Sequence, residues 1–394
     1  MARDERSRPR LPAAVVVLGF TSLFTDVGTE MIFPLLPVFL VEVLGAAPAY
    51  IGLVEGAADT VSSLLKLVSG VVADRVPKRQ PLVLLGYGLA SAVRPFIALA
   101  TRPWHVLAVR VTDRVGKGIR GSPRDAIIAD AAGDRAGRAF GYQAAMDNAG
   151  AVLGPLVATG LVALHFSLRA VFWVAVVPGA IATLLVLFVR EPARASPAKR
   201  AGPAPPVLTR TVTSYLGVLA LFSLANSSDG FLLLRARSVG LATAWIPILW
   251  SALNASKVLW AWLGGSLADR VPRARLIAIG WFVYAAVYVG LGVAVRSWQV
   301  WALFLVYGIF YGLTEPVEKA LVKDLVLPEQ RGRAYGAYNF VVGITSLPAG
   351  LLTGALWDAW GPGPALEVGA ALAAAAGVAL LAWDAWRTPR APVG

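Results

Sequence analysis

The sequence predicts an all-α membrane protein with twelve transmembrane helices arranged as two pseudo-symmetric six-helix bundles. Three observations carry this prediction. Hydrophobic residues make up 57% of the 394 residues and charged residues only 15%, whereas soluble domains carry about 25% charged residues. Apolar runs of transmembrane length, about 20 residues each, recur along the chain. Several segments of the first half also return in the second half at nearly constant spacing.

Twelve spans fit the chain when each is given roughly 20 residues. The first apolar run continues through Leu40 without a convincing cleavage site, so we expect an uncleaved first helix. Residues 191–207, EPARASPAKRAGPAPPV, predict a cytoplasmic linker between domains 1–190 and 208–394. The expected span centres are Asp26, Leu64, Ala90, Lys117, Gly154, Trp173, Ala225, Lys257, Val283, Phe310, Gly343 and Ala375.

The repeat between the halves is visible in three places. SGVVADRVPKRQ at 69–80 returns as GGSLADRVPRAR at 264–275, with Asp74 and Asp269 in matching positions. RPWHV at 102–106 returns as RSWQV at 296–300, and RAFGYQAA at 138–145 returns as RAYGAYNF at 333–340. Nearly constant spacing predicts two bundles of the same topology, related by an axis along the membrane normal.

Basic residues are distributed unequally between alternate loops. One side holds 21 Lys and Arg and the other holds 5, although the whole chain has a net charge of +13. This asymmetry follows the positive-inside rule and predicts that both termini are cytoplasmic. The basicity is therefore a topology signal, and we expect no nucleic-acid partner. Cysteine is absent, which excludes disulfides and thiolate metal sites.

One predicted span carries a stripe of cations. In RVTDRVGKGIRGSPRDAIIAD at 110–130 the basic residues are spaced by four, three, three and four, so they share one helical face. A charge at the bilayer centre costs about 2.5–3.5 kcal/mol even on the mildest scale. We therefore expect this helix to line a water-filled pathway. The stripe consists of Arg110, Arg114, Lys117, Arg120 and Arg124, with Asp113 and Asp125 beside it.

Acidic residues also occur inside the predicted spans. Asp26 and Glu30 are four residues apart, as are Glu55 and Asp59, and Asp147 lies in the fifth span. Two carboxylates in a poorly hydrated site resist ionising together, which suits a carrier that binds and releases protons. The alternative is that these acids only neutralise the cationic stripe, because the first-half spans hold seven acids and seven bases.

The second half carries fewer charges within its spans. Asp229 has no partner nearby in the sequence, so it is our candidate for the second wall of a cavity, together with Asn254. Glu315 and Lys319 are four residues apart, and we expect them to form an ion pair.

The chain resembles the major facilitator superfamily of secondary transporters over nearly its whole length. The superfamily's loop signature, Gly-x-x-x-Asp-Arg-x-x-x-(Arg/Lys), has counterparts in both halves, and the resemblance implies that it acts as a gating motif. A fifth-helix pattern associated with exporters is present without its usual Gly-Gly continuation. The matching residues are Gly70, Asp74, Arg75 and Arg79, then Gly265, Asp269 and Arg270, with Arg110 on the fourth helix and Gly150, Gly154 and Pro155 on the fifth.

These observations predict a proton-coupled secondary transporter that moves a small organic solute, either anionic or drug-like, by alternating access. Efflux by proton antiport is the leading hypothesis. The alternatives are uptake of an organic anion by symport or facilitated diffusion, and a non-transporting membrane sensor with the same fold. We find no enzyme motif and expect no catalytic residue, cofactor or metal. The expected partners are a small-molecule substrate, protons and membrane lipid, and we expect a monomer in the bacterial inner membrane.

Overall fold

A computed structural model describes residues 11–132, 136–191, 209–267, 271–327 and 331–387. Helices account for the regular structure throughout these ranges, and no strand occurs within them. Nine helical segments of the described chain are long and apolar enough to cross a membrane. The prediction of an all-helical membrane protein is therefore confirmed.

The first half consists of six helical segments, several of them interrupted. Pro34, Pro37 and Pro95 lie at the interruptions of the first and third segments, where proline lacks the N–H for a helical hydrogen bond. The segments are α1 (Ala13–Ile32) with η1 (Phe33–Leu35), α2 (Leu36–Val38) and η2 (Phe39–Val43); α3 (Ala49–Arg75); α4 (Gln80–Val93) with η3 (Arg94–Ile97); α5 (Pro103–Ala132); α6 (Ala136–Ala163); and α7 (Leu168–Val174) with α8 (Val176–Val186).

The second half repeats this arrangement with six further segments. Its first segment breaks at residues 226–228, and Ser228 caps the helix that follows by accepting a hydrogen bond from the Gly230 amide. The segments are α9 (Arg210–Ala225) with α10 (Asp229–Ser238); η5 (Thr243–Trp245) with α11 (Ile246–Leu267); α12 (Arg273–Val293); α13 (Ser297–Asp324); α14 (Arg331–Trp360); and α15 (Pro362–Arg387). Each of the twelve predicted span centres falls within one of these twelve segments.

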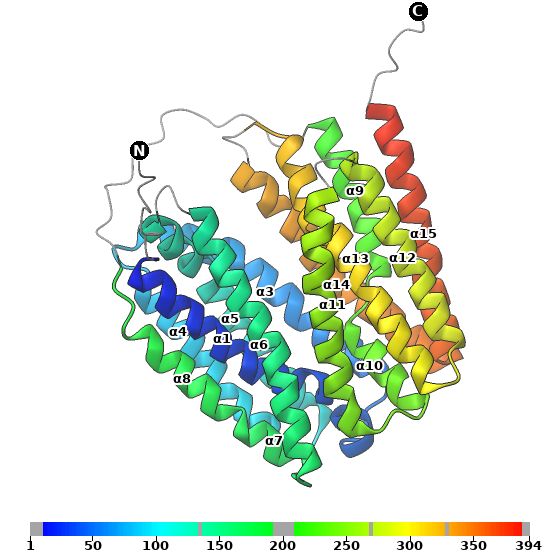
Figure 1. Cartoon of the computed structure of the whole chain (residues 1–394), viewed down its shortest axis with the longest axis horizontal. Coiled ribbons are helices and arrows are strands. Elements are labelled where there is room, and N and C mark those ends of the chain that lie inside the picture. The colour runs from blue at the N-terminus through cyan, green and yellow to red at the C-terminus, as the bar shows by residue number, and fades with distance from the viewer. Residues whose placement is uncertain (1–10, 133–135, 192–208, 268–270, 328–330, 388–394) are drawn as a thin grey trace, which may run out of the picture.

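Figure 1 shows the helices of the first half on one side of the molecule and those of the second half on the other. Helix α1 begins and α15 ends at the same end, which we call the terminal end; the other is the opposite end. The halves meet mainly where α3 packs on α14 and α6 on α11. The division into domains 1–190 and 208–394 stays a prediction, and most of the expected linker lies outside the described residues.

The halves come closest together towards the opposite end. A side chain on Gly52 of α3 would overlap the backbone of Gly350 in α14, and one on Gly354 would overlap Ala49. Small residues therefore allow the two helices to cross with their backbones nearly in contact. An ion pair of 2.7 Å between Arg237 and Glu42 also joins the halves there. The opposite end is thus closed by contacts between the halves.

Candidate substrate cavity

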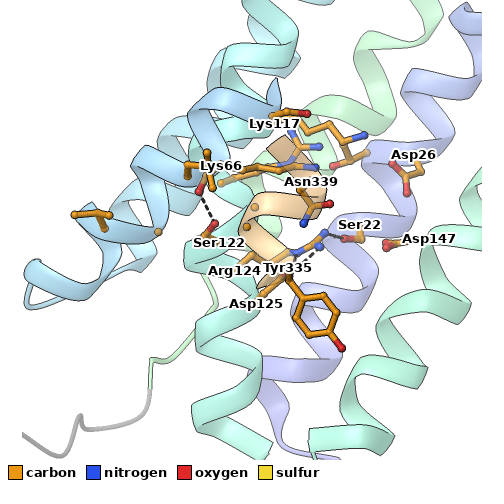
Figure 2. Close-up of a pocket in the computed structure, with 18 residues that line it drawn as sticks. Ser22, Asp26, Lys66, Lys117, Ser122, Arg124, Asp125, Asp147, Tyr335 and Asn339 are labelled. Atoms are coloured by element: carbon orange, nitrogen blue, oxygen red, sulfur yellow. Dashed lines mark hydrogen bonds and ion pairs between the residues drawn. The ribbon is translucent and has the colours of Figure 1, made fainter. Parts of the chain in front are cut away.

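Two neighbouring cavities lie between the halves. The central cavity, of about 590 Å³, has walls from both halves that include Glu30, Asp229 and Trp250. The vestibule, of about 660 Å³, lies nearer the terminal end and is lined by residues of α1, α3, α5, α6 and α14 (Figure 2). Asp26, Lys117 and Asp147 line both, so the two cavities form one path along the interface.

Helix α5 carries the cationic stripe past these cavities. It is continuous from Pro103 to Ala132 despite its charges. Arg110, Arg114 and Arg120 are buried within the protein, while Lys117 is exposed and lines both cavities. The low cost of a charge that faces protein or a wet cavity explains why this span can cross the molecule.

Four of the seven bases in the first-half spans form ion pairs with four of the seven acids. Arg110 donates two hydrogen bonds to Glu55, at 3.0 and 2.5 Å, and the Arg94 guanidinium lies 2.7 Å from Asp113. Both pairs are buried, so each charge depends on its partner. The other two pairs are Arg114 with Asp59 at 3.7 Å and Arg124 with Asp125 at 2.9 Å.

Three bases and three acids remain without an ion pair among the described residues. The bases are Lys66, Lys117 and Arg120, and the acids are Asp26, Glu30 and Asp147. The Arg120 guanidinium lies 4.2 Å from the centre of the Tyr87 ring, and its Nη1 is buried without a hydrogen-bond partner. Asp147 accepts a hydrogen bond from Gln143 at 2.9 Å.

The glycines of the fifth-helix pattern lie directly against two of these acids. A side chain on Gly150 of α6 would overlap Cβ of Asp26, and one on Gly154 would overlap Cβ of Glu30. The glycines therefore allow α6 to pack closely on α1 at the level of the carboxylates. Pro155 follows within the same helix. The sequence identified these residues but not the contact between them.

The second wall of the central cavity is built around Asp229, the first residue of α10. Its carboxylate accepts hydrogen bonds from Tyr307 at 3.1 Å and Tyr311 at 2.7 Å, and Lys257 Nζ lies 3.7 Å away. The Lys257 ammonium also lies 3.7 Å from the centre of the Tyr311 ring and 4.8 Å from that of Trp250. A cation held between aromatic rings and a carboxylate is doubly stabilised.

Polar contacts between the halves close the central cavity towards the opposite end. Trp250 Nε1 donates to Glu30 at 2.7 Å, and Asn254 donates to the Ala151 carbonyl at 3.3 Å. Asn254 therefore links the halves as well as lining the cavity. The predicted Glu315–Lys319 ion pair is confirmed at 2.9 Å, and Glu315 lines the same cavity.

The loop signature of the first half lies beside the terminal end. Gly70 lies against Ser122 of α5, and Arg75 is exposed. Arg79 is buried and donates to Asp130 at 2.5 Å, which ties the start of α4 to the end of α5. The side chain of Asp74, the surroundings of Gly265, and both Asp269 and Arg270 lie outside what the structure describes.

Several lining residues were not selected from the sequence. Tyr311 is one of the second-half aromatic residues for which the sequence favoured packing or an interfacial position over a pocket. It follows Lys117 by the 194 residues that separate RPWHV from RSWQV, so the internal repeat contained a signal for it. Lys66 is one of the seven bases of the first-half spans, and its position in the sequence gave it no specific role. No pattern in the sequence singles out Asn339, which lines the vestibule from α14 (Figure 2).

Comparisons with known proteins agree with this architecture. A sequence profile of the Major Facilitator Superfamily matches residues 18–344 and 255–394. An uncharacterized MFS-type transporter of Methanocaldococcus jannaschii is 33% identical over 391 residues, which cover 97% of either chain. The class C tetracycline resistance protein of Escherichia coli is 26% identical over 384 residues, covering 91% of this chain and 94% of the other.

Solved structures show the same fold at much lower sequence identity. A variant of the nucleoside transporter NupG superposes with a TM-score of 0.81 at 13% identity, covering 94% of this chain and 99% of the other. This likeness shows that the two proteins share the same overall fold. The family itself is shown by the profile match and by the relative that is 33% identical. The chain belongs to the Major Facilitator Superfamily of membrane transporters.

Proposed function

We propose that this transporter exports a small organic solute in exchange for protons by alternating access. The observation that carries the proposal is the position of Asp26. Its carboxylate lines both cavities and has no ion pair or hydrogen bond with another described residue. A carboxyl group in such a place can bind either a proton or a cationic group of a solute, which is the competition that antiport requires.

The arrangement of the halves supports the same direction of transport. Contacts between the halves close the opposite end, while the vestibule lies towards the terminal end. If both termini are cytoplasmic, as the distribution of basic residues predicts, this is the state in which an exporter collects its substrate. The similarity to a tetracycline resistance protein also favours export.

The second candidate is uptake of an organic anion with protons. The cations Lys117 and Arg120 favour it, since neither forms an ion pair among the described residues. In that case the protons bound by the acids would be transported together with the anion instead of competing with it. The two candidates differ in the sign of the coupling between solute flux and the pH gradient.

Proteoliposomes with an imposed pH gradient test the proposal. Each proton exchanged per solute in an electroneutral cycle gives about a tenfold change in solute ratio for each pH unit, because one unit equals about 1.4 kcal/mol. We expect solute to move against the proton flux, and Asp26→Asn or Asp147→Asn to abolish this coupling while the protein still inserts. Solute movement along the proton flux would indicate symport, and unchanged coupling in both variants would exclude the acids from the mechanism.

A non-transporting sensor is the remaining alternative. Such a protein would bind its ligand without catalysing flux in the same proteoliposomes. Binding without flux, in either direction of the gradient, would therefore contradict the transport proposal.

A further inference from the structure

The two signs of unpaired charge occupy different walls of the vestibule. Lys66 comes from α3, and Lys117 and Arg120 come from α5, whereas Asp26 comes from α1 and Asp147 from α6. Figure 2 shows Lys66 on one side and Asp26 with Asp147 on the other. Since no base of this set lies within ion-pair distance of a described acid, the walls face each other without neutralising each other.

One cation of this set, Arg120, is buried, and for it the lack of a charged partner among the described residues is unfavourable. A buried ionised group without a partner is costly, and burial makes an unsatisfied donor expensive as well. Arg120 is 6% exposed, it makes no hydrogen bond with a described residue, and its Nη1 is buried without a partner. The neighbouring Arg124 differs, because Asp125 and Ser22 satisfy its guanidinium.

We propose that the substrate carries one cationic and one anionic group, and that it bridges the two walls of the vestibule. Lys117 and Arg120 bind the anionic group, and Asp26 and Asp147 bind the cationic group. This inference rests on the proposed transport function and deepens it by naming the substrate class. Water can satisfy the same groups while the cavity is open, so the substrate replaces water on both walls.

Singly charged substrates fit this cavity less well. An anion alone would leave the carboxylates of Asp26 and Asp147 without a cation, and a cation alone would leave Lys117 and Arg120 without an anion. The excess charges of the two walls are similar in number, because Arg124 and Asp125 neutralise each other. A zwitterion satisfies both walls without changing the net charge of the cavity.

The available volume accommodates such a molecule with a spacer between its charges. The vestibule alone provides about 660 Å³, within the range of about 300–1,000 Å³ typical of small-molecule sites. Because the walls lie beyond ion-pair distance, the two charged groups of the substrate must be separated. A series of ω-amino acids, from glycine to 6-aminohexanoate, samples this separation in single methylene steps.

Binding of these probes to the purified full-length transporter tests the proposal. Fluorescence of the 13 tryptophans and thermal stabilisation provide the readout. We expect one chain length in the series to bind best, and to bind at least about tenfold more tightly than the carboxylate and the amine of the same length, since a hydrogen bond to a charged group accounts for such a factor. Equal binding of the carboxylate alone or of the amine alone would overturn the proposal, as would no response to any zwitterion.

Two variants separate the contributions of the walls. Arg120→Gln should weaken binding of the best zwitterion at least tenfold and leave binding of the matched amine unchanged. Asp26→Asn should weaken the zwitterion and leave the matched carboxylate unchanged. Neither residue forms an ion pair with a described residue, so both variants are expected to fold. The exposed Arg102, outside both cavities, provides the control Arg102→Gln, which should bind every probe like the parent.

The result is independent of the transport assay. If the zwitterion binds as expected but no flux accompanies it, the substrate class stands and the transport proposal fails. If a solute of a single charge is exported against protons and no zwitterion binds, transport stands and the dipolar substrate is refuted.

Discussion

The ion pair between Arg110 and Glu55 provides a quantitative test of the difference between structural and substrate-facing charges. Both side chains are almost fully buried, at 4% and 7% exposure, and two hydrogen bonds join them. In Glu55→Gln the one carboxylate of the described residues that stays within ion-pair distance of the guanidinium is Asp113, at 3.9 Å. Removing one partner of a buried pair costs about 3–5 kcal/mol, so we expect the free energy of unfolding to fall by that amount.

Replacing both partners with apolar residues should recover most of the lost free energy of unfolding. Buried ion pairs exchanged for apolar residues of similar volume are often neutral or stabilising by about 1–4 kcal/mol. The double variant Arg110→Met with Glu55→Met should therefore be more stable than Glu55→Gln alone. Asp113 tolerates the loss of Arg110, because Arg94 remains 2.7 Å away.

The matched control is another replacement of an acid by its amide, at a position without an ion pair. Asp26→Asn breaks no ion pair with a described residue, so its free energy of unfolding should change by less than about 1 kcal/mol. Denaturant unfolding in mixed micelles, followed by tryptophan fluorescence, measures all three variants. Equal losses in Glu55→Gln and Asp26→Asn would refute the division of these charges into paired and unpaired classes.

Two further substitutions test the contacts between the halves and the second cavity wall. Gly350→Val should prevent the close approach of α14 to Gly52 and open the opposite end. A cysteine introduced at the buried Ser251 should then react faster with a thiol reagent. An unchanged labelling rate would contradict the proposed closure. Tyr311→Phe removes one hydrogen bond to the Asp229 carboxylate, so it should lower stability by about 1.5–3 kcal/mol, and an unchanged unfolding midpoint would show that this bond contributes little.

The helices were predictable because hydrophobic length and internal repetition are properties of the sequence itself. Even α5 could be recognised, since its cations keep one helical face although no apolar criterion selects it. The interruptions within the helical segments were harder to predict from the sequence. Asp229 was expected in the middle of a span, whereas it begins α10 after an interruption, where a helix N-terminus favours an acid.

The pairing of charges was not predictable from spacing. Arg110 binds Glu55, which is 55 residues away, while Arg94 binds Asp113 across two different elements. Such partners depend on which helix faces pack together, and the sequence specifies the faces but not their neighbours. The equal count of acids and bases suggested complete neutralisation. Asp26 belongs instead to the three acids of these spans that have no ion pair within the described part of the chain.

The location of the ion pairs also bears on how the halves can move. The buried pairs Arg110–Glu55 and Arg94–Asp113 join elements of the same half, so they can persist while one half rotates against the other. Among the described residues the ion pair between the halves is Arg237–Glu42, and both of its side chains are about one-third exposed or more. Exposed pairs contribute only about 0–1 kcal/mol. Among the described residues, the buried ion pairs therefore lie within one half and an exposed pair joins the halves, so the alternating access proposed above would not require a buried ion pair to break.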